Sequence, residues 1–173
     1  MADAQSGTVS QFKNQENTSY TKFLTFTVGE EDYGIDIQYV TEIIGVQPIT
    51  RLPQSPEFVK GVINLRGLVI PVIDVRMRFQ LEQREYDDRT CIIVVEVHER
   101  QVGLVVDSVK EVTDIAHNQI EPPPPLHGDS QEDFIQGLGK LDKEVKILLD
   151  VSKLIFEKDL AGVQNASPET QPI

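Results

Sequence analysis

Apolar residues recur along the middle of the chain in short runs that glycine, proline and aspartate interrupt. In residues 22–28, apolar side chains alternate with hydroxyl and charged ones, which is the period-two pattern of a half-buried strand. A turn at 29–32 and an extended segment at 33–37 would complete a hairpin with it. The pattern therefore predicts short strands joined by tight turns.

A second hairpin is expected from 61–65 and 69–74, with Arg66 and Gly67 at the turn between them. Gly67 suits a left-handed backbone conformation, and the Asn64 side chain can satisfy backbone groups of the turn. The turn would hold the Arg66 guanidinium rigidly beside apolar strands. This position suits the binding of a partner's carboxylate or carbonyl oxygen.

The second half of the chain shows the same style of pattern. Its apolar runs are short, polar turns separate them, and no alternation of strands with long helices appears. The expected strands are 90–97, 101–107, 109–112, 134–141 and 145–150. With about five strands in each half, the fold class is all-β and is built from small barrels.

Three aspartates are placed to begin short helices by accepting hydrogen bonds from backbone N–H groups. Asp36 precedes apolar residues at helical spacing, and Gly45 follows them. Asp74 and Asp150 each stand at the end of an expected strand. The expected helices are 37–44, 75–79 and 151–158.

Length and composition fit one domain, or two small barrels that share a core. The 173 residues include 16 Lys and Arg against 28 Asp and Glu, which gives a net charge of −12. This charge argues against binding to nucleic acid or to anionic membranes. Cys91 has no partner for a disulfide, and no signal or membrane-spanning segment is evident. We expect a cytoplasmic protein without membrane insertion.

The two ends of the chain differ from the middle. Gln, Asn, Ser, Thr and Ala are common there, so residues 1–19 and 160–173 are expected to be disordered tails. A folded domain is expected at 20–159. Its first barrel would span about 20–86 and its second about 87–159, with exchange of strands between them allowed.

Candidate catalytic and metal-binding groups form no recognised pattern. The histidines His98, His117 and His127 lie in expected turns or loops and have no metal-ligand partner at a suitable spacing. Neither a nucleophile motif nor a distinctive pair of carboxylates is present. The residues therefore predict no enzyme, no metal and no cofactor.

Residues 56–76 strongly resemble the signature of the CheW family, the adaptors of bacterial chemotaxis arrays. The resemblance continues at 26–37, 41–43, 103–109 and 137–139, and covers roughly 20–156 in order. It implies two five-stranded, SH3-like β-barrels that share a hydrophobic core, with a few short helices. It also implies a scaffold that couples membrane chemoreceptors to the CheA histidine kinase in signalling arrays.

The resemblance places receptor contact in the groove between the barrels. The matching residues are Val40 and Glu42 on the first short helix, Arg66 at the turn, and Val109 and Val112 in the second half. For the three valines, core packing is an equal alternative. Glu42 and Arg66 carry less of that ambiguity, because charged residues are seldom buried unpaired.

Kinase contact is implied for the first barrel and its end loops. The matching residues are Gly61, Ile49, Leu52 and Phe58. The partners implied are the CheA histidine kinase and the cytoplasmic tips of methyl-accepting chemoreceptors, so the protein would associate with membrane receptor arrays. The kinase's regulatory domain and the CheV fusion share this fold. A stand-alone adaptor is favoured because neither a kinase core nor a receiver domain is present.

The rival hypothesis comes from another class of protein. A small-molecule-binding β-barrel would use the groove between the barrels as its ligand pocket. Such a pocket needs an apolar cavity with convergent polar groups, and the sequence shows no such polar cluster.

Overall fold

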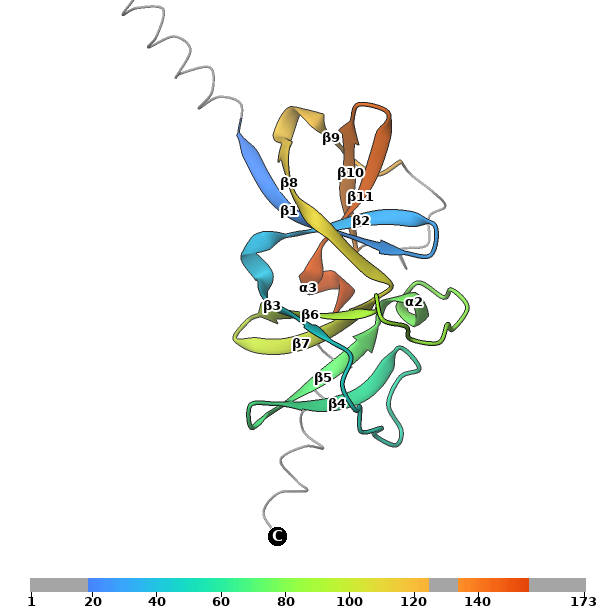
Figure 1. Ribbon diagram of the computed structural model, residues 1–173. Coiled ribbons are helices and arrows are strands. Elements are labelled where there is room, and N and C mark those ends of the chain that lie inside the picture. The colour runs from blue at the N-terminus through green and yellow to red at the C-terminus, as the bar shows by residue number, and fades with distance from the viewer. Residues whose placement is uncertain (1–18, 125–133, 156–173) are drawn as a thin grey trace, which may run out of the picture.

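Strands dominate the computed structural model, which describes residues 19–124 and 134–155 (Figure 1). The expectations for the tails fall almost wholly on residues outside these ranges. One sheet has six strands in the order β8-β1-β2-β11-β10-β9. They are β1 (Tyr20–Val28), β2 (Glu31–Asp36), β8 (Ser108–Ala116), β9 (Ile120–Glu121), β10 (Ile135–Leu141) and β11 (Glu144–Leu149).

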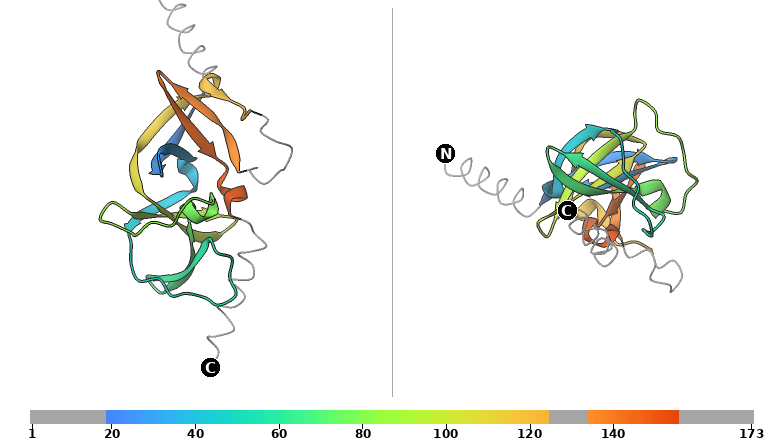
Figure 2. Two further views of the ribbon diagram at one scale, coloured as in Figure 1. Left: turned by 90° about the vertical axis from the view of Figure 1, so that its right-hand side faces the viewer. Right: turned by 90° about the horizontal axis from the view of Figure 1, so that it is seen from below.

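The other sheet has five strands in the order β3-β6-β7-β5-β4. They are β3 (Val40–Gly45), β4 (Val59–Leu65), β5 (Leu68–Asp74), β6 (Cys91–Val97) and β7 (Arg100–Val106). Within the described residues, three short helical turns join strands, namely η1 (Ile37–Tyr39), α2 (Val75–Arg78) and η2 (His117–Gln119), and α3 (Val151–Leu154) follows the last strand. The two sheets form the two SH3-like barrels expected from the sequence, with the six-stranded one above the other in Figure 1 and in the left view of Figure 2.

The sequence suggested a division between the barrels near residue 86. The two barrels are instead not formed by successive halves of the chain. The five-stranded barrel uses consecutive strands, β3 to β7, whereas the six-stranded barrel combines both ends of the described chain. The long-range step is the parallel pairing of β2 with β11, in which Tyr33 lies opposite Ile147. A pattern of neighbouring residues carries no information about such a pairing. This pairing joins strands from the two ends of the described chain in one sheet.

The helix expected over 37–44 is wrong. Asp36 accepts a hydrogen bond from the backbone N–H of Gln38 at 3.0 Å, as a helix cap would. The helical part nevertheless stops at Tyr39, and the next residues form β3, paired antiparallel with β6. Residues 40–44 include β-branched Val, Thr and Ile, which favour extended backbone, and β6 pairs with Val40 and with the residues from Glu42 to Gly45. Val40 and Glu42 therefore lie on a strand.

The expected caps at Asp74 and Asp150 are confirmed. The Asp74 carboxylate accepts from Arg76 N at 2.9 Å, and the Asp150 carboxylate accepts from Ser152 N at 3.1 Å. α2 and α3 begin directly after these residues. The part of the helix expected over 151–158 that follows residue 155 lies outside the described residues.

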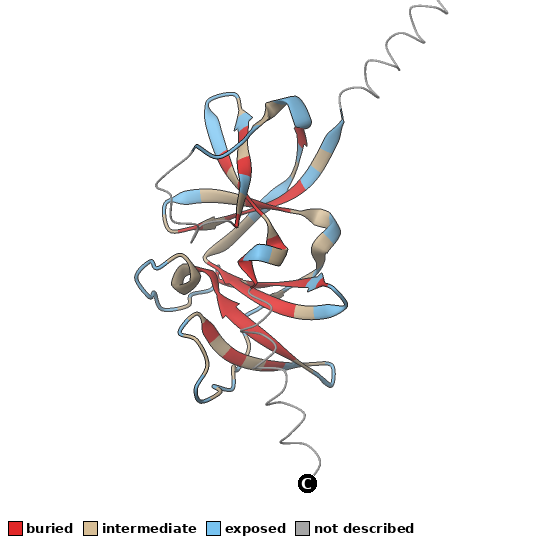
Figure 3. Ribbon diagram, turned by 180° about the vertical axis from the view of Figure 1, so that it is seen from behind, coloured by how far each residue is buried: buried red, intermediate tan, exposed pale blue. Residues whose placement is uncertain are grey.

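Three clusters of apolar side chains fill the molecule, and the buried positions concentrate on the strands that face the middle (Figure 3). The largest cluster lies between the sheets and includes Phe26 and Ile35 from one, and Ile93 and Leu104 from the other. α3 adds Val151 and Leu154 to it. The predicted shared core is confirmed. Smaller clusters belong to the separate barrels, around Ile92 in one and Ile115 in the other.

Candidate functional site

Glu42 and Arg66, both singled out from the sequence, bind each other directly. The Arg66 Nη1 and Nη2 atoms donate to the two Glu42 carboxylate oxygens at 2.7 and 2.8 Å. This two-point geometry matches the planar guanidinium to the carboxylate. The hydrogen bonds from Arg66 lower the pKa of Glu42, and those to Glu42 raise the pKa of Arg66. Both side chains are therefore charged at neutral pH.

The turn that carries Arg66 forms as expected. Arg66 and Gly67 have positive φ angles of 54° and 88°, and the Asn64 Oδ1 atom accepts a hydrogen bond from Gly67 N at 2.8 Å. The turn is brought to β3 by closure of the five-stranded barrel, since Thr50 and Val62 exchange two backbone hydrogen bonds of 2.8 Å. The Arg66 side chain is 72% exposed, against 27% for that of Glu42. Glu42 is thus held against the barrel, whereas the Arg66 guanidinium is open to solvent.

Exposed apolar side chains flank this ion pair in the sequence. Ile43 follows Glu42 and is 44% exposed, and Leu68 follows the turn and is 51% exposed. Large apolar side chains beside a charged group with spare donors are common at protein interfaces. Reasoning from the sequence did not single out Ile43, because β3 was taken for a helix, or Leu68, which the expected strand 69–74 left out.

The three valines expected in the groove have different environments. Val40 on β3 and Val109 on β8 are partly buried and pack against the central core, although they come from different sheets. Val112, also on β8, is 50% exposed. The structure therefore gives Val40 and Val109 a packing role and leaves Val112 open to contact.

The residues matched to the kinase contact lie on β4 and on the segment that joins β3 to β4. Gly61 on β4 has φ +148°, and a Cβ added there would meet the Thr50 carbonyl oxygen at 2.0 Å. Ile49 packs against the cluster inside this barrel, whereas Leu52 and Phe58 pack against the central core. The Phe58 ring also faces the Arg78 guanidinium, whose Cζ atom is 5.2 Å from the ring centroid. All four residues therefore contribute to the part of the barrel that is formed by β4 and the segment before it.

Sequence reasoning missed a charged junction between the barrels, centred on Asp107. Its carboxylate accepts a hydrogen bond from Gly29 N at 2.8 Å, in the β1–β2 turn of one barrel. Arg76 of α2, in the other barrel, donates to it through Nε at 2.9 and 3.1 Å. Arg84 approaches to 3.5 Å. A carboxylate in the apolar run 102–109 was a signal for such a junction, because a charge there needs partners.

A second missed cluster lies on the six-stranded barrel. Asp32 accepts hydrogen bonds from Lys110 Nζ and Lys146 Nζ at 2.7 Å each, and from the Thr27 hydroxyl at 2.9 Å. Burial raises the pKa of Asp32, but the hydrogen bonds from Lys110, Lys146 and Thr27 outweigh it and lower the pKa to about 2. Although Lys146 is buried, its ammonium group is therefore matched by a charged carboxylate.

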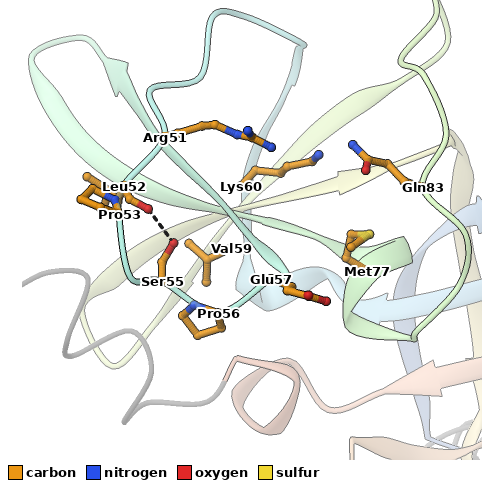
Figure 4. Close-up of a pocket in the computed structure, with 10 residues that line it drawn as sticks. All are labelled: Arg51, Leu52, Pro53, Ser55, Pro56, Glu57, Val59, Lys60, Met77 and Gln83. Carbon is orange, nitrogen blue, oxygen red and sulfur yellow. Dashed lines mark hydrogen bonds between the residues drawn. The ribbon is translucent and has the colours of Figure 1, made fainter.

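The described residues show no arrangement that suggests chemistry on a substrate. No group of three His, Cys, Asp or Glu side chains among them is placed to hold a metal ion. Within the same residues, no helix is long and apolar enough to span a membrane. A surface pocket of 610 Å³ does exist, at the loop that joins β3 to β4 (Figure 4).

Comparisons with known proteins agree with the geometry. The family model described as "CheW-like domain" matches residues 22–158. The chemotaxis protein CheW of Klebsiella aerogenes is 41% identical over 146 residues, which cover 84% of this chain and 88% of that protein. Protein FrzA of Myxococcus xanthus is 31% identical over 136 residues, or 78% of this chain and 84% of that protein.

A solved structure leads to the same family. The scaffolding protein TtCheW from Thermoanaerobacter tengcongensis superposes with a TM-score of 0.74 at 39% identity, covering 82% of this chain and 96% of that one. The family model's match over residues 22–158 includes strands of both barrels and the Glu42–Arg66 pair. The chain belongs to the CheW family of chemotaxis scaffold proteins.

Proposed function

We propose that this protein couples membrane chemoreceptors to the CheA histidine kinase, with the receptor bound at the Glu42–Arg66 end of the groove. Members of the CheW family are scaffolds rather than enzymes, which fits a site built for binding. The observation that carries the proposal is the bidentate ion pair at an exposed turn. It presents a fixed cation to a partner.

The geometry leaves Arg66 free to bind further groups. A guanidinium has five N–H donors, of which two point at the Glu42 oxygens. Three donors therefore remain for carbonyl or carboxylate groups of a receptor. Glu42 acts as a positioning residue, because its carboxylate fixes the orientation of the guanidinium.

Val112 extends the receptor surface along β8. Its 50% exposure supports direct contact with the partner. Val40 and Val109 would act by packing beneath this surface, since both contact the central core. A helical receptor tip, with apolar side chains on one face, suits such a combination of apolar surface and one fixed cation.

The kinase would bind the opposite end of the five-stranded barrel. Leu52 and Phe58 are partly exposed there, Ile49 supports the loop from inside, and Gly61 permits the close approach of Thr50. Two separate faces allow both partners to bind at once. In the cell this assembly would place the protein at membrane receptor arrays.

The first test removes the Arg66 side chain. Arg66→Ala should weaken binding of a purified receptor cytoplasmic fragment roughly thirtyfold, while the affinity for CheA stays within about threefold. The melting temperature should change by about 2 °C or less, because the guanidinium is largely exposed. Isothermal titration calorimetry measures both affinities.

Lys143→Ala is the matched control, since it removes an exposed cation from the β10–β11 turn. It should leave both affinities unchanged. Receptor-stimulated autophosphorylation of CheA should rise with wild-type protein and fail with Arg66→Ala. A folded Arg66→Ala variant that couples receptor to kinase at wild-type concentrations would refute the assigned role of this turn.

A further inference from the structure

The pocket at the β3–β4 loop has a mixed lining, and its apolar half is drawn from three parts of the chain. Leu52, Pro53 and Pro56 come from the loop, Val59 begins β4, and Met77 belongs to α2 (Figure 4). With a volume of 610 Å³, it has room for two or three amino-acid side chains of a partner.

The walls of this pocket are held in place before any partner binds. The Ser55 hydroxyl donates to the Leu52 carbonyl at 2.9 Å, and Val59 N donates to the Pro56 carbonyl at 3.0 Å. Behind them, Asp74 N donates to the Phe58 carbonyl at 2.8 Å. A preformed pocket binds a segment without the loss of conformational entropy that ordering its own loop would cost.

Two cations, Arg51 and Lys60, line the pocket. Among residues 19–124 and 134–155, no carboxylate forms an ion pair with Arg51 or Lys60. The Lys60 Nζ atom lies over the Tyr86 ring, 5.8 Å from its centre, so an aromatic face and not a carboxylate is its neighbour. In Figure 4 both side chains lie along one side of the pocket, and Glu57 lies on the other. The whole chain has a net charge of −12, so a site with two such cations contrasts with the rest of the molecule.

We infer that this pocket receives a partner segment in which an acidic side chain stands next to an apolar one. The carboxylate would meet Arg51 and Lys60, while the apolar side chain would enter between Leu52 and Met77. The acidic surface elsewhere repels such a segment and so restricts it to this site. The inference rests on the proposed function for the identity of the partner, since Leu52 also belongs to the proposed kinase face.

A displayed library of random heptapeptides tests the chemistry of the pocket without the kinase. Selection on the wild-type protein should enrich peptides with Asp or Glu beside an apolar residue. Recovery of these peptides should fall by at least about tenfold on the double variant Arg51→Gln/Lys60→Gln. The control Arg100→Gln/Lys143→Gln also changes the net charge from −12 to −14, but at hairpin turns, and should recover them like wild type.

Three results would overturn the inference about the pocket: no enrichment of peptides, enriched peptides without an acidic residue, or an equal loss of peptide recovery in both double variants. Amide chemical shifts of the wild-type protein, recorded with one enriched peptide, should change at residues 51–60 and at Met77. Changes elsewhere alone would also overturn it.

Titration of purified CheA separates this inference from the proposed function. Loss of kinase affinity in Arg51→Gln/Lys60→Gln, with the control unaffected, supports both. Peptide binding at the pocket with unchanged kinase affinity would refute the kinase as its partner and leave the pocket chemistry standing. Kinase affinity lost through Leu52→Ala, without any peptide binding, would refute the pocket chemistry and retain the kinase face.

Discussion

At the scale of single residues, two glycines with positive φ angles have different roles. Gly67 has φ +88°, and a Cβ added there would meet nothing within 4 Å. Gly61 has φ +148°, and its added Cβ would overlap the Thr50 carbonyl oxygen. The first glycine serves only the backbone angle of the turn, whereas the second also makes room for closure of the barrel.

Alanine substitution should distinguish these roles. Gly67→Ala should lower the free energy of unfolding by about 1 kcal/mol, through backbone strain alone. Gly61→Ala should lower it by about 3 kcal/mol or more, because the Thr50–Val62 hydrogen bonds must break or shift. Urea denaturation measures both values. Equal losses would show that the contact with Thr50 yields easily.

Asp32 should make the free energy of unfolding depend on pH in the acidic range. Its pKa is about 2 in the folded protein, below its ordinary value of 3.8, so the charged form stabilises the fold above pH 4. This stabilisation, about 2 kcal/mol, should disappear as the pH falls from 4 towards 2. We expect the stability difference between wild type and Asp32→Asn to shrink by that amount over this window.

Urea denaturation at a series of pH values measures this difference. Asp114→Asn serves as the control, because Asp114 pairs with Lys22 at the surface, where both side chains are more than half exposed. Its difference from wild type should change much less. A constant gap for Asp32→Asn would contradict the role of the Lys110 and Lys146 contacts.

At the scale of elements, Asp107 links parts that the chain order keeps separate. It stands between β7 and β8, where the chain passes from one barrel to the other, and contacts both Gly29 and Arg76. Arg76 and Asp107 are only 16% and 13% exposed. Since this carboxylate is bound from both barrels, it fixes how the barrels sit at the start of β8.

Removing the charge of Asp107 should therefore loosen that junction. Asp107→Asn should cost about 3 kcal/mol of unfolding free energy, because Arg76 is left nearly buried without its partner. The double variant Asp107→Asn/Arg76→Gln should lose at least about 1 kcal/mol less than the sum of the single losses. Thermal and urea melts of the four proteins complete the cycle; additive losses would mean that the two residues act independently.

At the scale of the whole molecule, the central cluster makes one unit of the two barrels. Phe26 and Ile35 from the six-stranded sheet pack with Ile93 and Leu104 from the five-stranded one, and all four are buried. Neither sheet can expose this surface without losing a large share of its apolar burial. The faces proposed for the receptor and the kinase are thus held on one rigid support.

Both barrels should unfold together. Native-state hydrogen exchange should give similar opening free energies, within about 1 kcal/mol, for the amides of Ile92 and Ile115, which lie in different barrel interiors. A value for one barrel that is lower by about 2 kcal/mol or more would show independent unfolding.

The sequence by itself determined the features that depend on a few neighbouring residues. The Arg66–Gly67 turn, the side-chain cap of Asn64 and the caps at Asp74 and Asp150 each need only local backbone angles and a nearby acceptor. Alternation of apolar and polar residues was enough for most strands. The resemblance to the CheW family, carried by the motifs around Arg66, supplied the barrels and the shared core.

Only the tertiary structure decided what depends on residues far apart in the chain. Residues 40–44 carry both helical spacing and β-branched side chains, and pairing with β6 settled them as a strand. Closure of the barrel brought Glu42 to Arg66, and the passage from β7 to β8 gave Asp107 its partners. These contacts require the packing of strands whose pairing is set by the burial of whole surfaces, which a local pattern does not encode.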